Sequence, residues 1–257
     1  MHHGRAHTGR MNTTPEPPSP VEEFVRRAER LAGGAERHVP SWLRPGDPES
    51  RLPVLAALIA AIALQLAITK TDYAVVPRWP LITLEALLLA VLVWLNPMRL
   101  TRSTLLGKYA TWVLLGAITI DNTVSAIVLD ARILSGRVSN DAALLLGSGA
   151  AIFVTNVIVF GIWYWELDRG GPFARREGRR PYPDFMFPQM DNPKVAKPDW
   201  RPTFVDYLYV SITNVMAFSP TDTMPLARWA KMMMTLQALV ALTTAGLVIA
   251  RAVNVLG

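Results

Sequence analysis

Polar side chains that interrupt long apolar runs are the residues of this chain best suited to chemistry. Asp121 lies near the middle of the apolar run Tyr109–Leu129, next to Asn122 and one helical turn before Ser125. A charge at the centre of a bilayer costs about 2.5–3.5 kcal/mol on insertion scales, so such a side chain should face the interior of a helix bundle. The other polar side chains that we single out in apolar runs are Glu85, Asn156, Asn214 and Gln237.

Two interpretations of these intramembrane polar residues remain open. In the first, Glu85, Asp121, Asn156 and Asn214 line a pathway for protons or monovalent cations. In the second, they form hydrogen bonds that hold helices together, and Asp121 is neutral.

A dense arginine cluster is the second feature with chemical potential. Its members, flanked by Phe173 and Tyr182, are Arg175, Arg176, Arg179 and Arg180. One interpretation is attraction to anionic lipid, worth about 1 kcal/mol per basic residue near the membrane surface. The other is a signal that sets membrane orientation without a specific partner. Either role explains the basic character of the chain, so we expect no nucleic-acid partner.

Composition excludes several classes of enzyme. The chain has no cysteine, which rules out disulfides, zinc–thiolate sites, iron–sulfur clusters and a cysteine nucleophile. The histidines all precede the first apolar run; they are His2, His3, His7 and His38. We therefore expect no cofactor, no metal site and no enzymatic activity.

The elements that position these residues are predicted to be membrane helices. Hydrophobic residues make up 51% of the chain and charged residues 18%, and the apolar residues gather into runs of nearly the 20 or so residues that cross a bilayer. The fold class is thus an all-α, polytopic transmembrane helix bundle. The predicted spans are Leu52–Thr69, Trp79–Leu95, Tyr109–Leu129, Ala142–Trp165, Phe204–Ser219 and Met232–Ala250.

The chain divides into four regions. Residues 1–51 form a polar tail with a short amphipathic helix at Val21–Leu31, and residues 52–165 hold four transmembrane helices. Residues 166–203 form a loop with seven prolines and eight basic residues, and residues 204–257 form a helical hairpin.

Basic residues also predict the orientation. The tail contains eight arginines, and the 96–108 and 166–203 loops are basic, whereas the alternate loops are poorer in Lys and Arg. The positive-inside rule then places the N-terminus and the 166–203 loop in the cytoplasm. With Phe204–Ser219 as a full crossing, which we favour, there are six spans and the C-terminus is also inside. The alternative is five spans plus one re-entrant half-helix.

The segment Phe204–Val253 resembles the pore helix, filter and inner helix of two-transmembrane potassium channels. Five residues fall on the pore helix in this alignment, namely Tyr207, Tyr209, Ser211, Thr213 and Asn214. Asp222 falls on the Asp after the filter, and Pro225 and Arg228 on the Pro and Arg beyond it. The whole chain also resembles a group of uncharacterised bacterial polytopic membrane proteins, which implies a bacterial inner membrane.

The region equivalent to the filter departs from the potassium-channel pattern TVGYGD. It consists of Ala217, Phe218, Ser219, Pro220, Thr221 and Asp222. Ser219 and Thr221 replace the two glycines that permit a left-handed backbone, and Pro220 replaces the tyrosine and removes a donor. The usual ladder of backbone carbonyls is therefore not expected.

Two functions follow from the sequence. The first is channel-like ion translocation with a non-standard filter region, in which Asp222 attracts cations at the mouth. The second is a non-transporting membrane scaffold that binds lipids or a partner protein. A pore built like that of a potassium channel would need four chains, whereas a six-helix bundle could act alone, so a homo-oligomer is left open.

Overall fold

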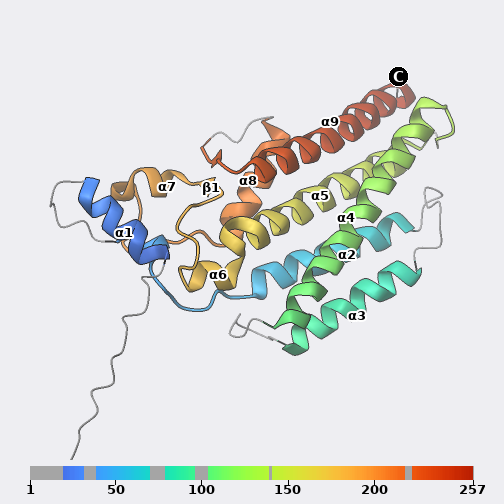
Figure 1. Cartoon of the computed structure of the whole chain (residues 1–257). Coiled ribbons are helices and arrows are strands. Elements are labelled where there is room, and N and C mark those ends of the chain that lie inside the picture. Colours follow the sequence, from blue (N-terminus) through green and yellow to red (C-terminus); the bar gives the residue numbers. More distant parts are fainter. Residues whose placement is uncertain are drawn as a thin grey trace, which may run out of the picture.

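The computed structural model describes residues 20–31, 39–69, 79–95, 104–138, 141–217 and 222–256 of the 257-residue chain. Long helices form an elongated bundle (Figure 1). They are α2 (Leu52–Thr69), α3 (Trp79–Leu95), α4 (Leu105–Leu134), α5 (Ala142–Leu167) and α9 (Arg228–Leu256). The predicted all-α class is confirmed.

Among the described residues, three helices are long and apolar enough to cross a membrane, judged by length and composition. They comprise Leu105–Leu134, Ala142–Gly170 and Arg228–Val255. Shorter apolar stretches occupy Leu52–Leu66 and Trp79–Leu95. At 1.5 Å per residue, even the shorter of the three exceeds the ~30 Å of hydrocarbon in a typical bilayer.

Side-chain caps fix where two of these helices begin. The Thr104 hydroxyl accepts a hydrogen bond from the Gly107 amide (3.0 Å) at the start of α4. Asp141 accepts from the amides of Ala143 (2.9 Å) and Leu144 (3.1 Å) at the start of α5. Each cap satisfies amides that have no partner within the helix.

Helix α5 is the central helix and packs against α2, α4, α8 and α9. Helix α8 (Phe204–Met216) approaches it closely, because a Cβ at Gly161 would lie 3.1 Å from the Leu208 Cα. Further along, Ser211 Oγ donates to the Val157 carbonyl (2.6 Å). Helix α8 therefore runs antiparallel to the last turns of α5.

Helix α8 is a half-helix. Its 13 residues extend only about 20 Å, less than the thickness of the hydrocarbon core. By Met224–Pro225 (β2) the chain pairs antiparallel with Phe185–Met186 (β1), at the end of the bundle where α8 begins. Helix α9 starts at this same end, where Trp229 Nε1 donates to Asp184 next to β1. The shortness of α8 leaves the favoured prediction of a full crossing at Phe204–Ser219 unconfirmed, and the alternative is the re-entrant half-helix. Local hydropathy could not reveal the β1–β2 pair, because it joins residues far apart in sequence.

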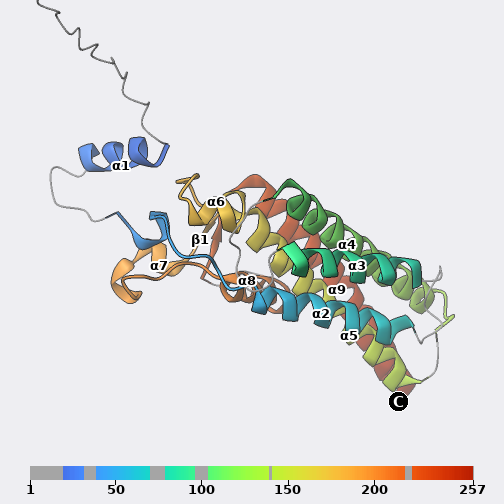
Figure 2. The same ribbon diagram turned by 90° about the horizontal axis from the view of Figure 1, so that it is seen from below.

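Short elements cover one end of the bundle. They are η1 (Ser41–Leu43), η2 (Asp168–Gly170), α6 (Pro172–Arg176), α7 (Pro188–Asp191) and η3 (Pro193–Val195). We call residues 39–51, 166–203 and 222–227 the cap. It lies at the opposite end of the bundle from the C-terminus (Figure 2). The amphipathic helix α1 (Pro20–Leu31) contacts the cap through Phe24, whose ring meets Tyr182 edge-on.

Candidate functional site

The start of α8 is fixed by one buried tyrosine and a capping box. The Thr203 amide donates to Asp206 (2.7 Å), while Thr203 caps the helix in return. Tyr207 is fully buried, and its hydroxyl donates to Asp168 Oδ2 (2.6 Å). Its ring meets Phe187 edge-on at 5.3 Å. The first turn of the half-helix therefore has little freedom to shift.

Asp168 connects four segments that meet where the cap joins the bundle. Its carboxylate, fully buried at the end of α5, also accepts from the backbone amides of Asp184 (2.9 Å) and Phe185 (3.3 Å). Asp184 in turn accepts from the Arg169 amide (2.7 Å) and from Trp229 Nε1 in α9 (3.1 Å). One pair of carboxylates thus links α5, β1, α8 and α9.

Arg169 has a left-handed backbone that is uncommon for a side-chain-bearing residue. Its φ of 51° is held by the bond from its amide to Asp184 and by its own guanidinium, which donates to Asp168 (3.3 Å) and to the Trp42 carbonyl (2.8 Å). Such a conformation costs about 1–3 kcal/mol and persists where the surroundings determine it. It turns the chain out of α5 and into the cap.

Arg175 is buried, so its prediction as a lipid-facing residue is wrong. Helix α6 directs its guanidinium inward, where it donates to the carbonyls of Trp165 and Asp168 and pairs with Glu49 (3.4 Å). Burial lowers the pKa of this guanidinium, but Tyr207 and the surrounding carboxylates raise it, and the net pKa lies above its ordinary value. Arg175 is therefore a buried, charged residue that holds segments of the cap together.

The rest of the arginine cluster lies nearer the surface. Arg176 and Arg179 both pair with Glu177, and the Arg179 side chain is 64% exposed. Arg180 is also exposed. Contact of these three side chains with anionic lipid stays a prediction.

Four buried polar side chains form hydrogen bonds around the C-terminal half of α8. Gln237 Oε1, in α9, accepts from Tyr164 (2.6 Å) and from Asn214 Nδ2 (2.9 Å). Its Nε2 donates to Ser211 Oγ (2.6 Å), and Asn214 also donates to the Met234 carbonyl (2.9 Å). We call Tyr164, Ser211, Asn214 and Gln237 the α8 cluster. It joins two predicted intramembrane residues, Asn214 and Gln237, in one network across α5, α8 and α9.

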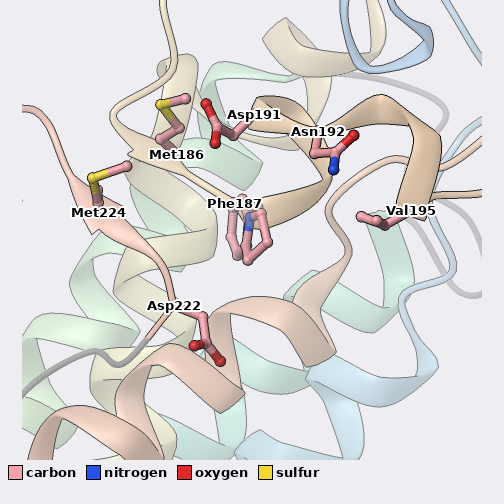
Figure 3. Close-up of a pocket in the computed structure, with 8 residues that line it drawn as sticks. Met186, Phe187, Asp191, Asn192, Val195, Asp222 and Met224 are labelled. Carbon is pink, nitrogen blue, oxygen red and sulfur yellow. The ribbon is translucent and has the colours of Figure 1, made fainter.

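The filter-equivalent residues fall partly within the described chain. Ala217 is exposed and ends α8, whereas Phe218, Ser219, Pro220 and Thr221 lie outside the described residues. Asp222 is exposed and lines a hollow of about 360 Å³ shared with α7 (Figure 3). Asp191 lines the same hollow, and in this view Phe187 lies between the two carboxylates.

The remaining intramembrane polar residues belong to other helices. Glu85 in α3 is fully buried, and Asp121 in α4 is half-buried and accepts from Gln65 Nε2 of α2 (3.2 Å). Asn122 and Asn156 are both buried, on α4 and α5. The structure thus pairs Asp121 with Gln65, whereas Asn156 makes no hydrogen bond to the α8 cluster within the described chain.

Sequence reasoning missed the residues that hold the cap. Asp168, Arg169 and Glu49 lie outside the apolar runs that we searched for polar groups, and Tyr164 reads as an interfacial aromatic. One available signal is the sequence Asp168-Arg169-Gly170-Gly171-Pro172 directly after an apolar run. Both glycines have positive φ, as expected where a helix ends in a sharp turn.

No group of three or more His, Asp or Glu side chains within the described residues could hold a metal ion. Comparison of the chain with protein-family models, curated proteins and solved structures finds no match. Function must therefore be argued from the half-helix and its surroundings.

Proposed function

We propose that this protein is an integral membrane protein that translocates monovalent cations in a channel-like manner, with the C-terminal end of α8 as the narrow part of the route. One observation carries the proposal. Helix α8 has only 13 residues, and at Met224–Pro225 the chain pairs with β1, at the end of the bundle where α8 begins. A scaffold protein has no need of a helix that stops halfway.

The electrostatics of a half-helix favour a cation at its inner end. The last four carbonyls of a helix have no intrahelical partner, and the macrodipole adds roughly −0.5 of an elementary charge there. Half-helix C-termini and unwound carbonyls coordinate cations in membrane transporters. The carbonyls near Asn214–Met216 supply such a site, and neutral oxygens suit a monovalent ion better than a divalent one.

Flux through reconstituted vesicles tests this function. Ala217→Trp places a bulky side chain at the exposed inner end of α8, and Val205→Trp places the same side chain at its exposed start. We expect wild type and Val205→Trp to dissipate a K⁺ or Na⁺ gradient. Ala217→Trp should slow this flux roughly tenfold or more, equivalent to a barrier higher by about 1.4 kcal/mol. Equal rates for both variants would exclude the α8 route.

We also propose an orientation with the cap and the N-terminus in the cytoplasm of a bacterium and the C-terminus outside. The cap contains Arg44, Arg51 and the eight basic residues of the 166–203 loop, whereas the Lys and Arg residues described at the opposite end are Arg132, Arg137 and Arg251. The positive-inside rule then gives five crossings, with the half-helix entering from the cytoplasmic side. This is opposite to the entry side in potassium channels.

Thiol labelling of intact cells tests this orientation, since the chain has no cysteine of its own. Single cysteines replace three exposed residues, Arg180 in the cap, Arg137 in the distal loop and Asn254 near the C-terminus. A membrane-impermeant reagent should label Arg137→Cys and Asn254→Cys but not Arg180→Cys, and all three should label in lysed cells. If Asn254→Cys stays protected while Arg137→Cys reacts, the C-terminus is inside and six crossings are restored.

A second candidate is a membrane scaffold that binds lipid or a partner protein. It is favoured by α1, which gathers its apolar residues on one face, and by the exposed Arg179 and Arg180. Absence of cation flux from folded wild-type protein, together with binding to vesicles rich in anionic lipid, would favour this candidate.

A further inference from the structure

Asn156 is a buried carboxamide without a hydrogen-bond partner in the part of the chain that the structure describes. Its side chain is on the central helix α5, and the residue is 1% exposed. Neither Nδ2 nor Oδ1 has a hydrogen-bond partner within the described chain. Leaving a buried polar group unsatisfied is strongly unfavourable, and native proteins rarely do so unless water or another group completes the bonds. An unpartnered amide at this depth therefore points to a bound molecule.

One hydrogen bond and one shared hydrophobic cluster place Asn156 relative to α4. Trp163 Nε1 donates to Thr119 Oγ1 of α4 (2.9 Å), and Ile152 belongs to the same buried cluster as Ala126 of α4. As α5 ascends from 152 to 163, α4 therefore descends from 126 to 119, and the two helices are antiparallel. Asn156 lies between Ile152 and Trp163 on α5.

Asn122 lies between the corresponding residues of α4, Thr119 and Ala126. It is 4% exposed, so its side chain is directed into the bundle. Residues three and four apart share one face of a helix, which places Asn122 on the face of Thr119 and Ala126. By the same rule Asn156 shares a face with Ile152. The two buried carboxamides thus occupy one section of the α4–α5 seam, yet they do not hydrogen-bond to each other.

We propose that a buried water molecule bridges Asn122 and Asn156. A water molecule can donate two hydrogen bonds and accept two. It can therefore accept from the amide nitrogen of one carboxamide and donate to the amide oxygen of the other, and buried waters typically make about three such bonds. The nearby Ser125 hydroxyl donates its proton to the Asp121 carbonyl (2.6 Å). Two neutral amides do not balance the charge of a trapped ion, which favours water over a resident cation.

This site deepens the proposed function. It would place a water molecule beside Asp121 on the route of the cation, and this water would not belong to the α8 cluster. The inference about its role in flux rests on cation translocation, whereas the water bridge itself does not. A test that measures stability can therefore fail or succeed independently of the flux assay.

A double-mutant cycle with leucine tests the bridge, because leucine has nearly the shape of asparagine. Asn122→Leu, Asn156→Leu and the double variant are purified in detergent, and the midpoint of thermal unfolding is measured for each. With a bridging water, each single variant should lower the midpoint by several degrees, since it leaves the opposite amide unpaired. The double variant should lose less than the sum of the two, because both polar partners are then gone.

Two results would overturn the bridge. A raised midpoint for Asn156→Leu would show a dry, orphaned amide whose removal helps, and strictly additive losses would show that the two amides share nothing. Asn156→Ser covers the case in which leucine prevents folding, since a hydroxyl keeps polar contact and makes room for a second water. It should retain a higher midpoint than Asn156→Val, and the reverse order would also exclude a hydrated site.

Discussion

Helix α5 presents buried polar groups on two faces, and their hydrogen bonding differs. On the face toward α8 and α9, Tyr164 and the Val157 carbonyl belong to a network in which each side chain of the α8 cluster has a partner. On the face toward α4, Asn156 has none within the described chain. The side chains of the first face are hydrogen-bonded to one another and hold the helices together. On the second face, Asn156 is the group to which we assign the bridging water.

The difference matches what each face must do. Helix α8 exposes Val205, Tyr209 and Met216 on its outer side, and its apolar burial is limited for a helix of 13 residues. Directional hydrogen bonds to α5 and α9 therefore determine its position. The α4–α5 pair already has two long helices in contact, so it can leave amides available for water without losing its register.

The largest effect should come from Gln237→Leu, because this residue is the centre of the bonded face. Its removal leaves the Tyr164 hydroxyl without its partner and takes one bond from each of Ser211 and Asn214. We expect a loss of roughly 2–3 kcal/mol in the free energy of unfolding, from unpaired buried groups. Reversible unfolding in mixed micelles measures it.

The exposed Thr235, two residues earlier on α9, provides the matched control for Gln237→Leu. Thr235→Leu makes a similar chemical change where no buried partner is lost, and it should leave stability within about 0.5 kcal/mol of wild type. If the two variants were equally stable, the α8 cluster would not hold the half-helix, and the contrast between the two faces of α5 would disappear.

Much of the fold was predictable because local hydropathy indicates where apolar helices begin and end. The predicted bounds of α2 and α3 agree with the structure, since polar residues flank both runs. Helices α4 and α9 extend beyond Tyr109–Leu129 and Met232–Ala250, because helix propensity continues past the apolar stretch. The half-helix was not predictable from charge counting, because its return depends on the long-range pairing of Met186 with Met224.

The candidate site was predictable in its residues but not in its pairings. Polarity inside apolar runs identified Asn214, Gln237 and Asn156, yet only the packed helices reveal that the first two share hydrogen bonds and the third does not. The arginine cluster teaches the same lesson. Arg175 and Arg179 are one helical turn apart in sequence, but the short α6 buries the first against Glu49 and leaves the second exposed.

The smallest effect that still sharpens the contrast is that of Tyr164→Phe. This change removes one hydroxyl from the bonded face and leaves the ring in its contacts with Phe160 and Phe185. Gln237 Oε1 keeps the bond from Asn214, so no acceptor becomes fully unpaired. The expected loss is about 0.5–1.5 kcal/mol, clearly smaller than that of Gln237→Leu.

The same unfolding measurement checks the tyrosine, with Tyr209→Phe as its control, because the Tyr209 side chain is on α8 but is 51% exposed. That control should change stability little. A Tyr164→Phe loss as large as that of Gln237→Leu would mean that the cluster depends on its hydroxyl rather than on the glutamine. A negligible loss would mean that the Tyr164 hydroxyl readily finds water, and the bonded face of α5 would then be as hydrated as we propose the α4 face to be.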